Sequence, residues 1–458
     1  MRTPGTVPLL AAALLALAAS GPQAASAAPG HDGHCARSAH ARVPGAQKQQ
    51  WACLEDLTTA GLAGTPYTDM ADQAGLTAPG TRTPSGVPGT QIDGYFGDGS
   101  RTNTTHGWNH DAQFVIRLPD RWNGGLVVTA SPGNRKQYAT DTAISDRVLA
   151  QGYAYAATDK GNTGPDFYRD GVRPGDAVAE WNDRTTQLTR AAKRVVAQRY
   201  GSAPRRTYMT GISNAGYLTR WQLENHPELY DGGVDWEGVL WTADGPNLLT
   251  SLPTAVAFGQ GTADADAMYA AGFARGSEFL WPYHQKAYWG LTQKAYRAEF
   301  DPGYDPACPG TSAGSTTEEI LAPCASDASY AYAARPRSVR KAVARVALTG
   351  RIGKPLITLQ GHLDTLLPIA TDADVYRRMV DARGRGRLHR TYTIQGGTHT
   401  DGLYAAHPDR LRPILPCYRD AFDALVRWTR DGTEPPANRT VGRPADGDVV
   451  DTCSVRGS

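Results

Sequence analysis

The middle of the chain alternates short apolar runs with longer segments of helical periodicity. Residues 112–118 and 126–130 are predicted strands, and the second has the nearly continuous apolar character of a buried central strand. Residues 176–200 repeat apolar positions at helical spacing, and Gly201 supplies a stop. Strands that alternate with helices in this way predict an α/β fold with a mostly parallel central sheet and helices on both faces. The other predicted strands are 153–158, 207–210, 238–241, 355–360 and 390–395, and the other helices are 143–151, 371–383 and 417–429.

The same periodicity divides the chain into segments. Residues 28–95 are rich in Gly, Pro, Thr and Ala, which predicts an irregular N-terminal arm. Residues 96–245 and 346–430 carry the alternation and form the two parts of one core domain. Between them, residues 246–345 break the pattern and are rich in aromatic side chains. We interpret this insertion as a lid over the carboxyl ends of the strands, where ligands bind in such sheets, and its aromatic residues either form the lid's own core or face the ligand. Residues 431–458 are a polar tail.

The N-terminus has the pattern of a secretory signal peptide. Arg2 precedes an apolar run over residues 7–19, and Ala25-Ser26-Ala27 offers the small residues of a cleavage site, which predicts removal of residues 1–27. The run is shorter than the roughly 20 residues that span a bilayer, and no later segment is long and apolar enough. We therefore expect a secreted chain with no membrane partner.

Six cysteines form an even set, which predicts disulfides in an exported chain. Closeness in sequence favours the pairs Cys35–Cys53, Cys308–Cys324 and Cys417–Cys453.

Charge and motif content argue against several classes of partner. The chain has 47 basic and 45 acidic residues, a net charge of +2 and no basic block, so nucleic acid is not expected to bind. We find no dinucleotide fingerprint, phosphate loop or metal-ligand cluster in the sequence, so no cofactor is expected, although a calcium ion on carboxylates of the insertion is left open. A small or oligomeric substrate of modest charge fits this balance, and the oligomeric state stays unassigned.

Ser213 is the predicted nucleophile. It follows the strand 207–210 in a turn of small residues that leads into a helix, which is how α/β-hydrolases hold a serine at a strained apex. Gly211 and Gly216 permit the close approach of strand and helix, while Ala215 stands where glycine is commonest. The alternative is an ordinary helix-capping serine. Residues 310–314 match Gly-x-Ser-x-Gly letter for letter around Ser312, but no apolar strand precedes them, so Ser213 is preferred.

An aspartate and a histidine follow later strands in hydrolase order. Asp364 comes after the strand 355–360, where its carboxylate can fix the tautomer of an imidazole, and His399 comes after the strand 390–395 in the position of a general base. The order serine, aspartate, histidine is that of α/β-hydrolases. Rival residues are better explained by helix capping or by their place in neighbouring turns, and they are Asp372, Asp374, His362 and His407.

A tetrahedral intermediate needs two hydrogen-bond donors, each commonly worth about 3 kcal/mol of barrier. The backbone N–H of Asn214 is the first candidate. The second is expected from the loop 131–135, where Gly133 and Asn134 are equal candidates, unless this loop is a plain Pro-Gly turn.

Three blocks of the sequence resemble the bacterial extracellular 3-hydroxybutyrate oligomer hydrolases, and these are residues 131–135, 155–164 and 212–216. The wider layout is similar to the tannase and feruloyl esterase family, whose members usually carry cysteines beside the catalytic serine and histidine. Ile212 and Thr400 stand at those positions here. The resemblance covers residues 125–245 well and 350–402 loosely. It implies an α/β-hydrolase fold and cleavage of carboxylic esters of hydroxy acids, with Ser213 as nucleophile. Asp159 and Lys160 match the second block, with no role assigned.

The sequence therefore predicts a secreted serine carboxylesterase that forms an acyl-enzyme on Ser213, with esters of the 3-hydroxybutyrate type favoured as substrates. The alternatives are an aromatic acyl esterase of the tannase and feruloyl type, a secreted serine peptidase of the same fold, and a non-catalytic binding module that has lost the reaction.

Overall fold

The computed structural model describes residues 41–98, 111–311, 315–445 and 447–456. The predicted signal peptide, the predicted Cys35 partner of Cys53 and the alternative serine Ser312 lie outside these ranges.

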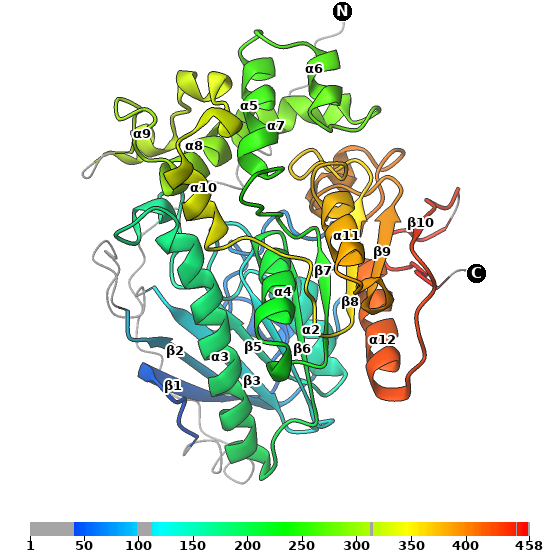
Figure 1. Ribbon diagram of the computed structural model, residues 1–458. Coiled ribbons are helices and arrows are strands. Elements are labelled where there is room, and N and C mark those ends of the chain that lie inside the picture. The colour runs from blue at the N-terminus through cyan, green and yellow to red at the C-terminus, as the bar shows by residue number, and fades with distance from the viewer. Residues whose placement is uncertain (1–40, 99–110, 312–314, 446, 457–458) are drawn as a thin grey trace, which may run out of the picture.

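The described strands form one sheet of ten in the order β1-β2-β3-β5-β4-β6-β7-β8-β9-β10 (Figure 1). The first four in this order pair antiparallel, and every pair from β5 to β10 is parallel. The predicted fold class, an α/β-hydrolase with a mostly parallel central sheet, is confirmed. The strands are β1 (Ala46–Leu54), β2 (Gly89–Phe96), β3 (Gln113–Pro119), β4 (Gly125–Ala130), β5 (Ala154–Thr158), β6 (Arg206–Ile212), β7 (Gly232–Trp236), β8 (Leu356–Gly361), β9 (His389–Ile394) and β10 (Arg439–Val441).

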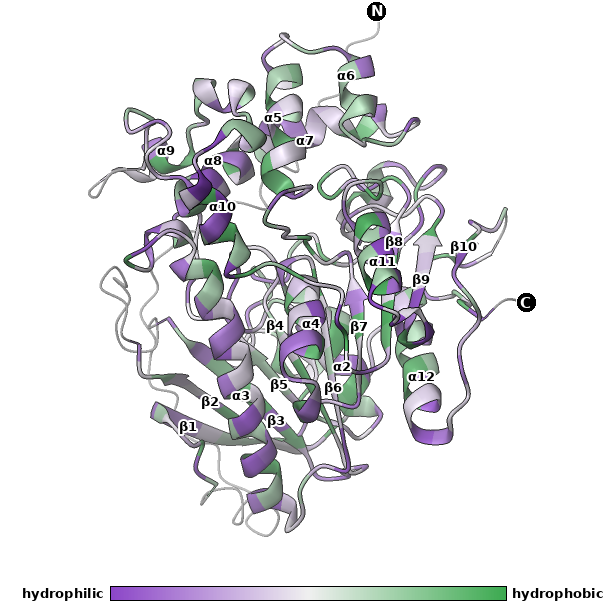
Figure 2. Cartoon of the chain, viewed as in Figure 1, coloured by the Kyte–Doolittle hydropathy of each residue, from purple (hydrophilic) through white to green (hydrophobic). Residues whose placement is uncertain are grey.

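Helices cover both faces of the sheet because side chains alternate across each strand. In β3, Phe114 and Ile116 pack in one buried cluster with residues of α3, while Val115 packs in the other with residues of α12. Figure 2 shows hydrophilic residues of α3 on the side away from the sheet. Helices α3, α4 and α11 cover the first face, and α2 and α12 cover the second. Their bounds are α2 (Asp146–Ala150), preceded by the π-helical turn η3 (Asp141–Ser145), α3 (Asp176–Tyr200), α4 (Asn214–Asn225), α11 (Ala373–Ala382) and α12 (Leu415–Asp431).

The N-terminal segment contributes two strands where the sequence predicted an irregular arm. β1 opens with a polar run over residues 47–50 and has no buried residue, so its pattern does not reveal a strand, yet its backbone pairs with β2 along eight positions. β2 is buried throughout and pairs with β3. The short helix α1 (Thr59–Leu62) lies between them. The prediction for residues 28–95 is therefore wrong for these two strands.

A predicted strand over residues 238–241 is also wrong, because the strand of this region is β7, several residues earlier. Its two initial glycines conceal it, but they are required by packing. A Cβ on Gly233 would lie 2.8 Å from the carbonyl oxygen of Met209 in β6. Residues 238–241 instead follow the end of the strand, and Leu240 donates its backbone N–H to the Asp372 carboxylate at 2.7 Å.

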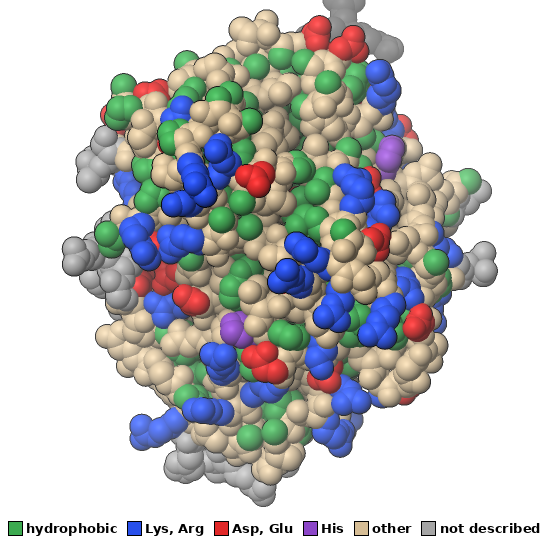
Figure 3. All heavy atoms as spheres, in the orientation of Figure 1, with side chains coloured by type: hydrophobic (Ala, Val, Ile, Leu, Met, Phe, Trp, Pro, Cys, Tyr) green, Lys and Arg blue, Asp and Glu red, His purple; other side chains and the backbone are tan. Residues whose placement is uncertain are grey.

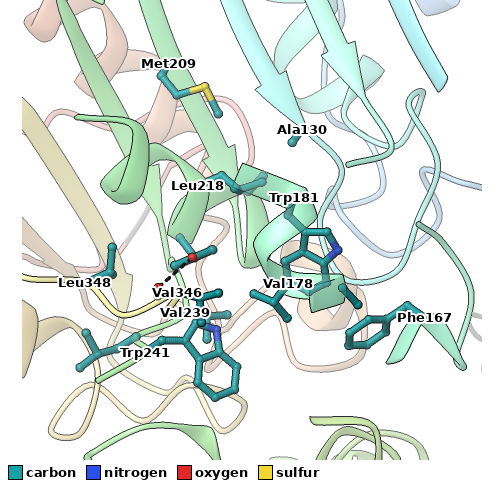
Figure 4. Packing of buried hydrophobic residues seen from close by; sticks show 14 of the residues in the cluster. Ala130, Phe167, Val178, Trp181, Met209, Leu218, Val239, Trp241, Val346 and Leu348 are labelled. Atoms are coloured by element: carbon teal, nitrogen blue, oxygen red, sulfur yellow. Dashed lines mark hydrogen bonds between the residues drawn. The ribbon is translucent and has the colours of Figure 1, made fainter. Parts of the chain in front are cut away.

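The insertion between β7 and β8 is helical and sits at the end of the sheet toward which β9 runs (Figure 1). Its aromatic residues Phe273, Trp281 and Trp289 are buried and build the core of the insertion. This core continues into the sheet's first cluster, where Figure 4 shows Phe167, Trp181 and Trp241 among aliphatic side chains. The helices are α5 (Leu248–Gly259), α6 (Ala265–Ala270), α7 (Trp281–Ala287), α8 (Trp289–Phe300), α9 (Thr317–Leu321) and α10 (Arg337–Ala344).

Two of the predicted disulfides are confirmed. Cys308 and Cys324 pair within the insertion, with their Cα atoms 5.6 Å apart. Cys417 and Cys453 pair with Cα atoms 4.8 Å apart, and this bond ties the C-terminal tail to α12.

The surface mixes both signs of charge. Figure 3 shows Lys and Arg side chains spread across one face with Asp and Glu among them. None of the helices in the described ranges combines the length and apolar character that a bilayer crossing requires.

Glu180 of α3 gives the stability of the protein a predictable pH dependence. Burial and a hydrogen bond with Asp170 raise the pKa of Glu180 to about 9, although Arg184 also binds it at 2.8 Å. A carboxyl group with a raised pKa stabilises the fold while it is protonated. That stability is lost as the pH rises from the pKa of an ordinary glutamate toward 9. The free energy of unfolding of the wild type should fall between pH 6 and pH 9. In Glu180→Gln we expect this fall to be smaller by about 1–3 kcal/mol, measured by urea unfolding at both pH values.

The exposed substitution Glu228→Gln is the control and should follow the wild-type curve. An equal loss of stability in Glu180→Gln and the wild type would contradict the assignment.

Candidate active site

Ser213 occupies the apex of the turn between β6 and α4. Its backbone has φ 60° and ψ −118°, a strained conformation for a residue with a side chain. The turn is fixed on both sides, since the N–H of Ser213 donates to the carbonyl of Trp236 at 3.0 Å and its own carbonyl accepts from Tyr217 at 2.9 Å. Ser213 is partly exposed, whereas the residues beside it are buried. The sequence placed this serine at such an apex, and the structure has it there.

The glycines of the turn are needed for close contact. A Cβ on Gly211 would lie 2.4 Å from the Cβ of Ala215, and a Cβ on Gly216 would lie 2.6 Å from Gly238. Ala215 itself is fully buried without displacing the turn. Its departure from the commonest motif therefore leaves the turn geometry intact.

Asp364 and His399 are brought together at the ends of β8 and β9. Nδ1 of His399 lies 2.9 Å from Oδ2 of Asp364, and both side chains are buried. The other oxygen of Asp364 accepts from the backbone N–H groups of Leu366 and Leu367, and Gln360 donates to Oδ2. These donors hold the carboxyl group of Asp364 against the imidazole. Because Nδ1 is engaged, Nε2 is the nitrogen left to act as a base.

The rival residues lie in other contacts. Asp372 binds Arg220 at 2.8 Å as part of a buried ion pair. His362 is exposed. His407 packs edge-on against Phe279 and lies 3.2 Å from the hydroxyl of Tyr283, both of the insertion.

Glu237 is a site residue that the sequence reasoning missed. It follows β7 directly, and its Oε2 lies 3.2 Å from Nδ1 of His399, on the side also occupied by Asp364. One carboxylate oxygen of Glu237, one of Asp364 and one ring nitrogen of His399 all lie within 4.8 Å of one another. An acidic residue directly after a strand next to β8 can be recognised in a sequence as a candidate site residue. The strand was wrongly predicted over residues 238–241, however, so Glu237 stood before the predicted strand and not after it.

The two carboxylates govern the proton affinity of the imidazole. Burial lowers the pKa of His399, but the charge of Asp364 and the hydrogen bonds to Asp364 and Glu237 outweigh it and raise the pKa above the ordinary histidine value. Burial, and then the charge of Asp364, raise the pKa of Glu237 well above that of an ordinary glutamate. Burial and Asp364 therefore both favour the protonated form of Glu237 beside the imidazole.

The side chain of Asn214 joins three parts of the site. Its Nδ2 donates to the carbonyl of Gly133 in the loop after β4 at 3.0 Å, and its Oδ1 accepts from the hydroxyl of Tyr296 in α8 at 2.8 Å. Gly133 has φ 54°, which favours glycine. The structure thus brings the predicted oxyanion loop beside the residue that follows Ser213. Asn134 lies in the same loop, where its carbonyl accepts from Gly164 at 2.9 Å.

Lys160 contacts the loop after β4, which contains Gly133, through the side chain of Ser131. It is fully buried and donates to the hydroxyl of Ser131 at 2.5 Å, and its ammonium lies 5.3 Å from the ring centre of Trp181. Burial lowers the pKa of Lys160 to about 7, against the charge of the adjacent Asp159. The matching block that the sequence left without a role therefore contributes a contact to the loop.

The insertion reaches the site through α7 and α8. Trp289 donates its ring N–H to the carbonyl of Thr365, next to Asp364, at 2.8 Å. Burial lowers the pKa of His284 in α7 to about 4, and the charges of both Asp364 and His399 act on it. His284 is partly exposed, and its ring lies 6.3 Å from that of Tyr288. These two side chains place aromatic surface beside the buried pair.

The parallel sheet, the strained serine turn after β6 and the aspartate and histidine after β8 and β9 define the chain as an α/β-hydrolase. Residues 99–236 match the family model described as tannase and feruloyl esterase, so the predicted likeness to that family is confirmed over this segment.

Individual proteins show the same likeness. The chain is 27% identical over 141 residues to the mono(2-hydroxyethyl) terephthalate hydrolase of Piscinibacter sakaiensis, a match that covers 28% of this chain and 23% of that protein. Among solved structures it is similar to feruloyl esterase B from Aspergillus oryzae, at 12% identity and a TM-score of 0.48 over 86% of this chain and 89% of that one. It is also similar to the tannin acyl hydrolase from Aspergillus niger, at 13% identity and a TM-score of 0.45 over 79% and 82% of the two chains.

Proposed function

We propose that this protein is a secreted serine carboxylesterase that works through an acyl-enzyme on Ser213. The observation that carries the proposal is the strained serine turn combined with the buried Asp364–His399 pair in hydrolase order. A serine hydroxyl is a weak nucleophile until a base takes its proton, and Nε2 of His399 is the base that this arrangement leaves available. Asp364 holds the imidazole in the required tautomer and stabilises the imidazolium that forms.

The oxyanion of the tetrahedral intermediate is assigned to the backbone N–H of Asn214 and to one donor from the loop of Gly133 and Asn134. The contact between the Asn214 side chain and the Gly133 carbonyl supports this assignment, because it fixes the loop against the serine turn. After acyl transfer, His399 returns its proton to the leaving alcohol, and a water molecule then repeats the cycle on the acyl-enzyme.

Esters of aromatic acids are the substrates we favour. The family match supports this choice, and the similar hydrolase of Piscinibacter sakaiensis is named for an aromatic ester. Tyr288 and His284 add ring surface beside the Asp364–His399 pair, on which an aromatic acyl group can stack. The second candidate class is 3-hydroxybutyrate oligomers, supported by the three matching sequence blocks around residues 131–135, 155–164 and 212–216.

A labelling and substrate experiment tests the function. The purified protein is treated with a fluorophosphonate probe and digested, and its rates on methyl ferulate, a 3-hydroxybutyrate dimer and an aminoacyl anilide are compared. We expect the label on the peptide that contains Ser213 and at least about tenfold faster turnover of methyl ferulate than of the dimer.

Faster turnover of the dimer would favour the second substrate class. Turnover of the anilide alone would indicate a peptidase, and a folded protein that is neither labelled nor active would indicate a binding module.

A further inference from the structure

Glu237 is a buried acid in a strained backbone conformation beside the imidazole of His399. Its φ is 51°, and its side chain is fully buried. Oε1 accepts from the backbone N–H of Gly361 at 2.5 Å, which directs Oε2 toward Nδ1 of His399 at 3.2 Å. A Cβ on Gly361 would lie 2.5 Å from Oε1, so a glycine is required there for the acid to reach the site. The fold thus accepts local strain to place a second carboxyl group at the imidazole.

The two acids that face His399 differ in the hydrogen bonds that they receive from the protein. Asp364 receives hydrogen bonds from two backbone N–H groups and an amide in addition to the imidazole. Among the described residues, Oε2 of Glu237 has no hydrogen-bond donor other than the nearby imidazole. Such an oxygen is where a buried carboxyl group keeps its proton. The titratable groups that face this point are Asp364, His399 and, from α7, His284.

We propose that Glu237 is a second positioning acid of His399, which shares the Nδ1 side of the imidazole with Asp364 and accepts the Nδ1 hydrogen bond when Asp364 is neutralised. The proposal rests on the proposed function, because it concerns the base of that reaction. Strand topology supports it, since Glu237, Asp364 and His399 follow the adjacent parallel strands β7, β8 and β9.

The proton balance of the proposal is simple. In the resting protein one proton is on Nδ1 of His399, and burial together with Asp364 favours a second proton on Glu237. When Nε2 takes the serine proton, the imidazolium faces both carboxyl groups, and its charge favours the ionised form of Glu237. If Asp364 becomes asparagine, the repulsion from Asp364, which raises the pKa of Glu237 in addition to burial, disappears, so Glu237 ionises more readily and can accept from Nδ1.

The experiment compares the wild type with Glu237→Gln, Asp364→Asn and the double variant. Histidine resonances of His399 are titrated by NMR, and hydrolysis of p-nitrophenyl butyrate is measured between pH 5 and pH 10. We expect Glu237→Gln to lower the pH at which His399 titrates and to move the acidic limb of kcat/KM the same way, because the imidazolium loses a partner. We expect Asp364→Asn to lose about 10²-fold in kcat and the double variant the roughly 10⁴-fold typical of a misoriented imidazole.

Glu224→Gln is the matched control, because Glu224 is a partly buried glutamate that also accepts from backbone N–H groups, those of Thr349 and Gly350. It should leave the His399 titration unchanged. A merely structural role for Glu237 would change the overall rate without moving the titration.

The proposal is overturned if His399 titrates identically in the wild type and Glu237→Gln, or if Asp364→Asn and the double variant have equal activity. Should Glu237→Gln not fold, the carboxyl carbon of Glu237 is observed in the labelled wild type, where a proton on Glu237 at pH 7 is expected and an ionised group contradicts the proposal. An unlabelled, inactive wild type in which the NMR shift still occurs would refute the esterase function alone.

Discussion

Replacement of Ser213 by alanine is expected to lower kcat on p-nitrophenyl butyrate by about 10⁶-fold, the scale on which removal of the nucleophile disables a triad. The loss is large because the acyl-enzyme cannot form, whereas the turn is held by backbone hydrogen bonds to Trp236 and Tyr217 that alanine preserves. Initial rates at saturating substrate measure the effect, with thermal unfolding as a check on folding.

Ser312→Ala provides the comparison, since residues 310–314 match Gly-x-Ser-x-Gly at every position but no apolar strand pattern precedes them in the sequence. It should retain wild-type activity. Full activity in Ser213→Ala would refute the mechanism. Loss of activity in Ser312→Ala alone would indicate that Ser312, in the insertion, is the nucleophile.

Substitution of Arg117 by methionine is expected to destabilise the protein by about 3–5 kcal/mol, because it leaves Asp141 buried without its cationic partner. Arg117 is fully buried and binds both oxygens of Asp141 at 2.6 and 2.7 Å. It also binds the Gln91 amide and the Tyr67 carbonyl, so it fastens the N-terminal segment to the core. The free energy of unfolding in urea measures the loss.

A partly exposed ion pair supplies the control for this effect. Arg377 lies 3.7 Å from Asp381 on α11, and Arg377→Met should cost less than about 1 kcal/mol. The double variant Arg117→Met with Asp141→Leu should recover part of the stability, since it removes the uncompensated charge. A cost for Arg117→Met as small as that of the control would show that the buried pair contributes little.

Regular periodicity allowed several elements to be predicted closely. The helix predicted over residues 176–200 has the same bounds as α3, because its apolar positions repeat over many turns and Gly201 ends it with φ 74°. The strand before Ser213 was also recognisable, because apolar residues precede a turn of small ones. Asp364 and His399 were predicted as partners by the same reasoning, and the structure places Nδ1 of His399 2.9 Å from Oδ2 of Asp364.

The failures have a common physical cause, which is that packing against a neighbouring strand can outweigh a weak local pattern. β1 has no buried residue and forms because its backbone pairs with β2, an interaction that its side-chain pattern does not encode. β7 begins with two glycines that the neighbouring strands require, so its pattern is too weak to be recognised. That error hid Glu237, whose position at the end of a strand is visible only when β7 is placed correctly. The link from Lys160 to Ser131 likewise depends on two loops that only the tertiary structure brings together.

The amide of Asn214 sets a condition for any chimera built from this protein. One end of the amide holds the loop of the core domain and the other holds a hydroxyl from the insertion, so the two modules are not independent at this point. A foreign insertion grafted between β7 and β8 would need to supply an equivalent hydroxyl at the place of Tyr296. Without it, Oδ1 of Asn214 would lose the donor that it has in Tyr296, next to Ser213, and the turn and the loop of Gly133 would lose a shared support.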